Sequence, residues 1–155
     1  MTFAETPGSL KRFRRTPWRF QTTFSTPLRN LPEFTAMILS SLGEVRSGIV
    51  LIDRVVFEPV NLIGLLKQDG FTGAVGHDVT LEATGAKDVG ELLEAALGDW
   101  LDFAFVPSPK PFVLYADHDE FTTFYANTKS HLNRVVEPLK ARGFREVPGF
   151  VRDNR

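Results

Sequence analysis

The chain has 155 residues, of which 43% are hydrophobic and 24% are charged, and its formal net charge is −1 at pH 7. These ordinary values suit one globular domain and exclude a wholly disordered chain. Cysteine is absent, which excludes disulfides, thiolate nucleophiles and cysteine-ligated metal sites. We find no apolar run as long as a membrane span and no signal-peptide core, so we expect a cytoplasmic protein without a membrane partner.

The charges are unevenly distributed along the chain. Residues 1–30 hold six basic residues and one acidic residue, for +5, and residues 78–120 hold two basic and ten acidic residues, for −8. Residues 121–155 return to +4, with seven basic and three acidic residues. An acidic middle between basic ends favours charged partners or self-association. We expect instead that the charges interleave on the folded surface, because blocks along a chain need not form patches in space.

Residues 1–17 are predicted to form a flexible, basic N-terminal arm, followed by a single α+β domain over residues 18–155. Basic arms can bind phosphate backbones, and Phe13, Trp18 and Phe20 could stack on bases. The alternative is an ordinary solvated N-terminus, since chain ends are often charged. The candidate binding residues here are Arg12, Arg14, Arg15 and Arg19, with Lys11 beside them.

The rest of the chain alternates strand patterns with helix patterns. Strands are predicted at residues 18–25, 48–57, 78–83, 100–106, 112–116, 121–126 and 144–151. Helices are predicted from about 32 to 42, 62 to 69, 88 to 97 and 128 to 142. Several strands follow one another without a helix between them, so purely parallel winding is excluded. We expect an α+β fold with a mixed, mainly antiparallel sheet and helices packed on one face, with a partly ferredoxin-like arrangement left open.

Local signals locate several of these elements. The run 48–57 is continuously apolar in its first half, which places it centrally in the sheet and predicts a buried Val50. Two helices are expected to end at Gly70-Phe71 and Gly143-Phe144, with glycine in the left-handed position that follows a helix. Pro138 falls inside the last helix and predicts either a kink or two short helical pieces.

Four consecutive polar residues, Asp117, His118, Asp119 and Glu120, separate two predicted strands, and we call them the acidic turn. Carboxylates and imidazole suit metal binding or acid–base chemistry, with His131 as a further candidate. Yet four neighbours on one turn do not easily point at one centre, so the expected alternative is a solvated hairpin turn. No metal site and no cofactor are assigned from the sequence. Tyr115 and Tyr125, on the flanking strands, are further binding candidates.

Three functions remain open. We expect a non-catalytic domain that binds another protein or a small molecule, including an immunity-like or inhibitor-like role in which an acidic surface neutralises a basic enzyme. The second function is a metal-dependent hydrolase that uses the acidic turn. The third is nucleic-acid binding through the basic arm. Association into a homo-oligomer also stays open.

Overall fold

The computed structural model describes residues 1–5 and 9–152, and five helices and seven strands lie in this part of the chain. Their order is β1 (Thr2–Glu5), α1 (Ser9–Arg15), β2 (Phe20–Ser25), α2 (Leu31–Ser40), β3 (Ser47–Arg54), α3 (Val60–Gln68), β4 (Val79–Thr84), α4 (Ala86–Gly98), β5 (Asp102–Ser108), β6 (Val113–Ala116), β7 (Phe121–Ala126) and α5 (Lys129–Ala141). No helix among these described residues is both long enough and apolar enough to cross a bilayer.

The seven strands form one sheet in the order β1-β4-β3-β5-β6-β7-β2, and every described pairing is antiparallel. The predicted α+β class is therefore confirmed, whereas a ferredoxin-like arrangement is not. The strand β3 lies between β4 and β5, and Val50 within it is fully buried. The interior placement of this apolar strand is also confirmed.

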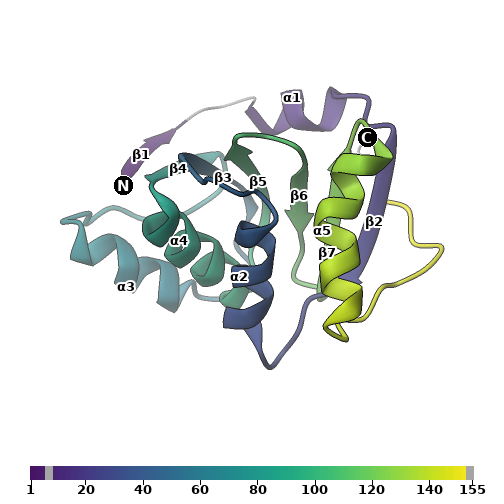
Figure 1. Ribbon diagram of the computed structural model, residues 1–155. Coiled ribbons are helices and arrows are strands. Elements are labelled where there is room, and N and C mark those ends of the chain that lie inside the picture. Colours follow the sequence, from purple (N-terminus) through teal and green to yellow (C-terminus); the bar gives the residue numbers. More distant parts are fainter. Residues whose placement is uncertain (6–8, 153–155) are drawn as a thin grey trace.

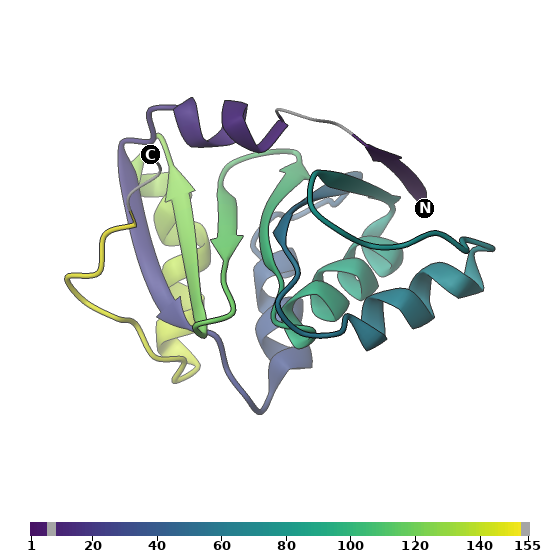
Figure 2. The same ribbon diagram turned by 180° about the vertical axis from the view of Figure 1, so that it is seen from behind.

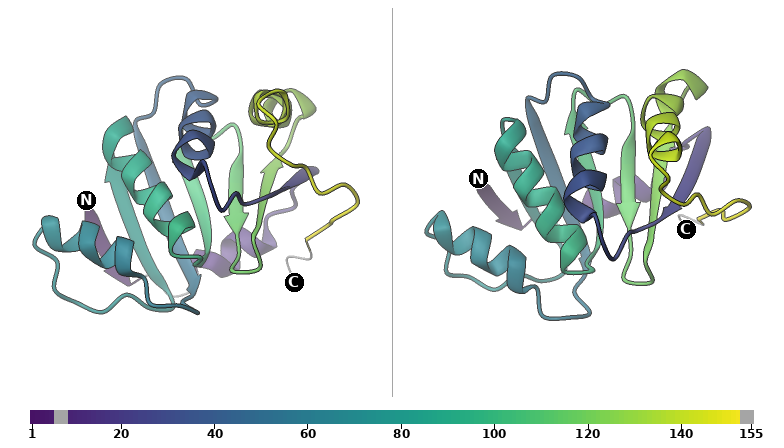
Figure 3. Two further views of the ribbon diagram at one scale, coloured as in Figure 1. Left: turned by 90° about the horizontal axis from the view of Figure 1, so that it is seen from below. Right: turned by 60° about the horizontal axis from the view of Figure 1, so that its bottom comes forward.

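Helices cover both faces of the sheet, not one as predicted (Figures 1 and 3). The helices α2, α4 and α5 pack on one face, where alternate strand residues such as Ile52 and Phe105 join the larger core, and α3 packs beside α4. The intervening residues, Leu51 and Ala104 among them, point to the opposite face because strand side chains alternate. There they meet α1, which runs along the top of the molecule in Figure 2.

The N-terminal segment is part of the domain, which corrects the prediction of a separate arm. The strand β1 pairs with β4 and extends the sheet. The helix α1 is held by Leu10 and Phe13, one helical turn apart, which are buried against the sheet. Phe13 packs against Tyr115 and Tyr125 and is not available to stack on bases. Residues 6–8, which belong to the predicted arm, lie outside the described residues.

The C-terminal segment also differs from the prediction, because residues 144–151 form no strand. One isolated bridge joins Glu146 to Phe24, and the Val147 N–H donates to the Thr23 carbonyl at 2.8 Å. Pro148 then interrupts the pairing because proline has no N–H to donate. Pro138 lies within α5 without dividing it into two pieces.

The predicted helix endings are confirmed. The N–H of Phe71 donates to the carbonyl of Leu66, and the N–H of Phe144 donates to that of Leu139, each at 3.0 Å. The glycine before each phenylalanine has a positive φ, as this ending requires. The helix α4 ends in the same way, but there Trp100 takes the positive φ of 55° instead of a glycine.

Candidate functional site

The acidic turn joins β6 to β7 and is organised by its own first residue. The Oδ1 atom of Asp117 accepts hydrogen bonds from the N–H groups of Asp119, at 2.9 Å, and Phe121, at 3.1 Å. Glu120 has a φ of 73°, in the left-handed region that such turns use. Asp119 is 73% exposed. These contacts are those of the hairpin turn that the sequence analysis favoured.

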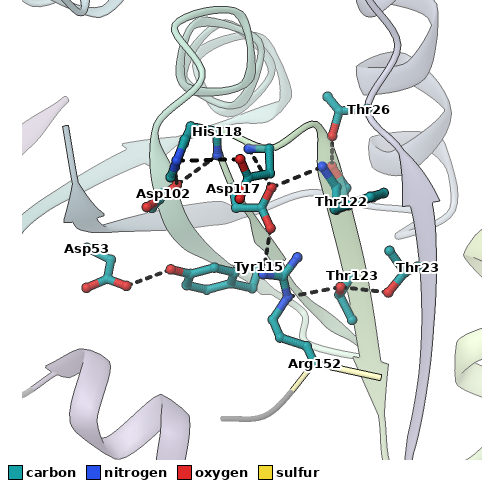
Figure 4. Close-up of polar contacts among 12 residues, drawn as sticks. Thr23, Thr26, Asp53, Asp102, Tyr115, Asp117, His118, Thr122, Thr123 and Arg152 are labelled. Atoms are coloured by element: carbon teal, nitrogen blue, oxygen red, sulfur yellow. Dashed lines mark hydrogen bonds and ion pairs between the residues drawn. The ribbon is translucent and has the colours of Figure 1, made fainter. Parts of the chain in front are cut away.

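The other carboxylate oxygen of Asp117 binds Arg152, from the C-terminal segment (Figure 4). The Nη1 atom of Arg152 donates to Oδ2 of Asp117 at 2.7 Å, and Nε donates to Oγ1 of Thr123 at 3.1 Å. The guanidinium carbon also lies 4.8 Å from the centre of the Tyr115 ring, in cation–π contact. The turn and the C-terminal segment are thus tied together on one face of the sheet.

His118 is bound to Asp102, a buried residue at the start of β5 (Figure 4). Both the ring Nδ1 and the backbone N of His118 lie 2.8 Å from the same carboxylate oxygen of Asp102. The hydrogen bond to Asp102 raises the pKa of His118 above its ordinary value of 6.5, and the nearby carboxylates of Asp102, Asp119 and Asp117 add to this rise. The Nδ1 atom of His118 is thus occupied by Asp102, and its Nε2 atom lies 3.6 Å from the exposed carboxylate of Asp119.

Tyr115 and Arg14, both binding candidates from the sequence, meet at Asp53. The Tyr115 hydroxyl donates to Oδ2 of Asp53 at 2.6 Å, and the Arg14 guanidinium pairs with the same oxygen. Burial raises the pKa of the Tyr115 hydroxyl well above its ordinary value, and the hydrogen bond to Asp53 raises it further. These contacts join α1 to β3 and β6.

The remaining predicted residues do not join the acidic turn. His131 is exposed in the first turn of α5, where its backbone N–H donates to Thr128, and the whole of β7 separates it from the turn. Tyr125 is fully buried and packs against Phe13 and Trp18. Among residues 1–5 and 9–152, no group of three or more His, Cys, Asp or Glu side chains could hold a metal ion. Arg12, Arg15 and Arg19 are exposed on or just after α1.

Asp53, Asp102 and Arg152 were not singled out by the sequence analysis. They lie 62, 16 and 35 residues from their respective partners Tyr115, His118 and Asp117. Such partners are selected by strand register and by the path of the C-terminal segment, so no local spacing in the sequence marks them. The one signal in the sequence is the alternation of side chains between the two faces of a strand, which places residues 115 and 117 on the same face as Val113.

One part of the chain carries a large excess of acidic residues. Residues 55–100 hold eight acidic and two basic residues, for a net charge of −6, and they form α3, β4 and α4. We call this part of the molecule the acidic end; it lies at the side of the sheet remote from α5 and β2 (Figure 1). Of the eight acidic side chains, that of Asp99 is buried, and the other seven are exposed or half-buried.

A groove of 510 Å³ runs between α3 and α4 at the acidic end, and we call it the α3–α4 groove. It is bounded by one side of each helix and by the first residue of α2. Val60, at its edge, is 62% exposed, and the neighbouring Phe57 is 56% exposed. The lining residues are Leu31, Val60, Asn61, Gly64, Leu65, Gln68, Glu91, Glu94, Ala95 and Gly98.

No family model matches this chain, and neither curated proteins nor solved structures give a match. The function is therefore inferred from the residues and contacts described above.

Proposed function

We propose that this protein is a non-catalytic domain that binds a basic polypeptide through its acidic end. The observation that carries this proposal is the net charge of −6 on residues 55–100, combined with the exposed apolar side chains of Phe57 and Val60. Charge complementarity steers a basic partner to such a surface, and apolar contacts at its centre hold the partner there. An immunity-like or inhibitor-like role, in which the partner is a basic enzyme, is one form of this function.

The contacts of the acidic turn support a non-catalytic role. Asp117 is paired with Arg152, and His118 is paired with Asp102. The carboxylate of Asp53 likewise binds Arg14. In each pair, an ionisable side chain of the type used in catalysis links two segments of the fold. A structural role therefore accounts for these side chains.

Affinity capture from an extract of the native host cells tests the proposal, with three forms of the protein as bait. The baits are the unchanged protein, a variant with Glu91→Lys and Glu94→Lys, and a matched variant with Glu44→Lys and Asp119→Lys. The matched variant carries the same change of charge at exposed residues outside the acidic end. We expect a basic protein that the unchanged and matched baits retain and the acidic-end variant loses. Retention by all three baits, or loss with the matched variant alone, contradicts the proposal.

Nucleic-acid binding is the second candidate, because α1 presents the exposed cations Lys11, Arg12 and Arg15. Fluorescence anisotropy with a labelled single-stranded oligonucleotide tests it, since counterion release makes phosphate contacts strongly salt-dependent. Binding that weakens with salt and is lost when these three residues become alanine supports it. No binding at low salt removes this candidate.

A further inference from the structure

We infer that the α3–α4 groove is the docking site for one basic, amphipathic helix of the partner protein. This inference rests on the proposed function and deepens it, because it names the place on the acidic end and the form of the bound segment. Four observations carry it: the arrangement of the groove walls, the helix-internal Gly64, the charge of the lining residues and the anchoring of α3 to α4.

The two walls of the groove are the facing sides of α3 and α4, and each contributes a row of side chains. From α3 come Val60, Gly64 and Gln68, which are spaced one helical turn apart, and from α4 come residues 91, 94, 95 and 98. The backbone N–H and C=O groups within both walls are already hydrogen-bonded inside α3 and α4. An extended peptide therefore finds no free backbone groups with which to form a β-sheet. Side chains of a third helix can enter the space between two such rows, as ridges of one helix fill grooves of another.

Gly64 has no explanation in the internal packing of the chain. It lies in the interior of α3, where glycine destabilises a helix relative to alanine. A Cβ atom built on Gly64 meets no atom within 4 Å, and the residue is exposed to the groove. At Gly98, by contrast, a Cβ atom would lie 3.4 Å from Asn61 and 3.5 Å from Leu31. The missing side chain at position 64 therefore leaves room for the close approach of a partner's backbone.

The charges select a basic occupant. Glu91 and Glu94 are the charged residues of the groove lining, and no Lys or Arg is among the described lining residues. Lys87 lies 4.0 Å from Glu91 but is 87% exposed, so solvent screens this contact. Lysine or arginine on the outer face of the docked helix would meet these carboxylates, while its apolar face meets Val60 and Leu65.

The walls are held together before any partner binds. Asp99, immediately after α4, accepts hydrogen bonds from the N–H groups of Asn61 and Leu62 in the first turn of α3. Two rigid walls lower the entropic cost of docking, because the site needs little rearrangement.

A second copy of this chain is the less favoured occupant. At the end of its basic helix α5, Lys140 and Arg142, the residue that follows the helix, already pair with Glu146 and Glu33. A contact between the acidic end of one copy and the basic side of another would be heterologous, and such contacts form a ring if the rotation closes and an open filament if it does not.

Selection from a displayed library of helical peptides tests the inference. The library contains peptides of about 20 residues, long enough to form a helix, with varied apolar residues on one face and varied charged or polar residues on the rest. The best binders are then titrated by fluorescence anisotropy against the unchanged protein and three variants. These are Gly64→Gln, a double variant with Glu91→Gln and Glu94→Gln, and the matched control Glu82→Gln. Glu82 is an exposed acidic residue of the same end, on β4, and it does not line the groove.

We expect basic amphipathic sequences to be enriched and Gly64→Gln to weaken their binding by at least about tenfold, although this variant should melt at a higher temperature. The double variant should also weaken binding, and Glu82→Gln should leave it within about twofold. Basic binders that are insensitive to Gly64→Gln and to the double variant but sensitive to Glu82→Gln overturn the groove inference and leave the proposed function standing. Failure to enrich any basic helical peptide overturns the inference, whereas the capture experiment with the three baits decides the proposed function separately. Concentration-dependent oligomers lost with Gly64→Gln would instead identify a second copy as the occupant and also overturn the inference.

Discussion

The carboxylate of Asp99 accepts a hydrogen bond of 2.8 Å from the backbone N–H of Leu62, so that the residue following α4 caps the start of α3. The other carboxylate oxygen accepts from the N–H of Asn61 at 3.0 Å. Pro59, which precedes α3, provides no side-chain cap, so Asp99 satisfies N–H groups that the helix itself leaves free. This one buried side chain fixes the geometry of the α3–α4 groove.

Replacing Asp99 with alanine should therefore lower the free energy of unfolding by about 1–3 kcal/mol, because it leaves two N–H groups of a helix start without their acceptors. Asp99→Asn keeps one acceptor oxygen and should cost less. Chemical denaturation of the three proteins measures both changes. A loss below about 0.5 kcal/mol for Asp99→Ala, as at ordinary surface sites, would contradict the capping role.

Gly64→Ala should raise the free energy of unfolding by about 0.5–1 kcal/mol, because alanine favours the helix interior and its Cβ enters open space. Gly48→Ala is the contrasting control. Its Cβ would lie 2.8 Å from both Phe105 and Val89, so overpacking should cost about 1–3 kcal/mol. Thermal and chemical unfolding report both changes. Destabilisation by Gly64→Ala would show that the glycine serves the fold and not the groove.

Tyr115→Phe should lower the free energy of unfolding by about 1–2 kcal/mol, because it removes a hydrogen-bond donor from the half-buried Asp53 carboxylate. A double-mutant cycle with Asp53→Ala separates this contact from the loss of packing. A coupling energy near zero between the two positions would show that the hydrogen bond contributes nothing to stability.

Arg152→Ala should cost about 3 kcal/mol of unfolding free energy, because it leaves the largely buried Asp117 carboxylate without its counter-ion. Arg145→Ala is the matched control, since Arg145 is an exposed arginine of the same segment. It should change the stability by less than about 0.5 kcal/mol. Equal effects of the two substitutions in chemical denaturation would argue that Arg152 does not anchor the C-terminal segment.

The contact between His118 and Asp102 should make stability depend on pH in a defined direction. Folding raises the pKa of His118, so the folded state binds the proton more tightly than the unfolded state does. The stabilisation is fully present below the ordinary pKa of 6.5 and is lost as the pH rises through the higher folded value. The difference in unfolding free energy between the unchanged protein and His118→Gln should therefore shrink as the pH rises from below 6.5 through the higher pKa of the folded state. A difference that grows over this range would contradict the assignment.

Much of the secondary structure could be predicted from local patterns. The apolar run of β3 and the periodicity of α5 are strong signals, and the Gly-Phe pairs after α3 and α5 locate two helix ends. The N-terminal elements were missed because α1 has only seven residues and buries few side chains, among them Leu10 and Phe13. Their partners on the sheet come from distant strands, so the segment reads as a solvated arm.

The candidate site was predicted less well than the fold. The acidic turn was located correctly as a hairpin turn, but its partners Asp102 and Arg152 depend on tertiary contacts that no local spacing reveals. The groove depends on the packing of α3 against α4, which Asp99 fixes from 37 and 38 residues away. Sequence periodicity identifies the buried side of each helix, but it does not show which exposed sides form a common surface.

The most direct test of the account is a map of backbone amide chemical shifts, recorded by NMR while the strongest basic helical peptide from the selection is added to the unchanged protein. The account predicts that the largest shifts fall on α3, α4 and Leu31, the elements that line the α3–α4 groove. Largest shifts on the acidic turn or on α1, with α3 and α4 unchanged, would contradict it.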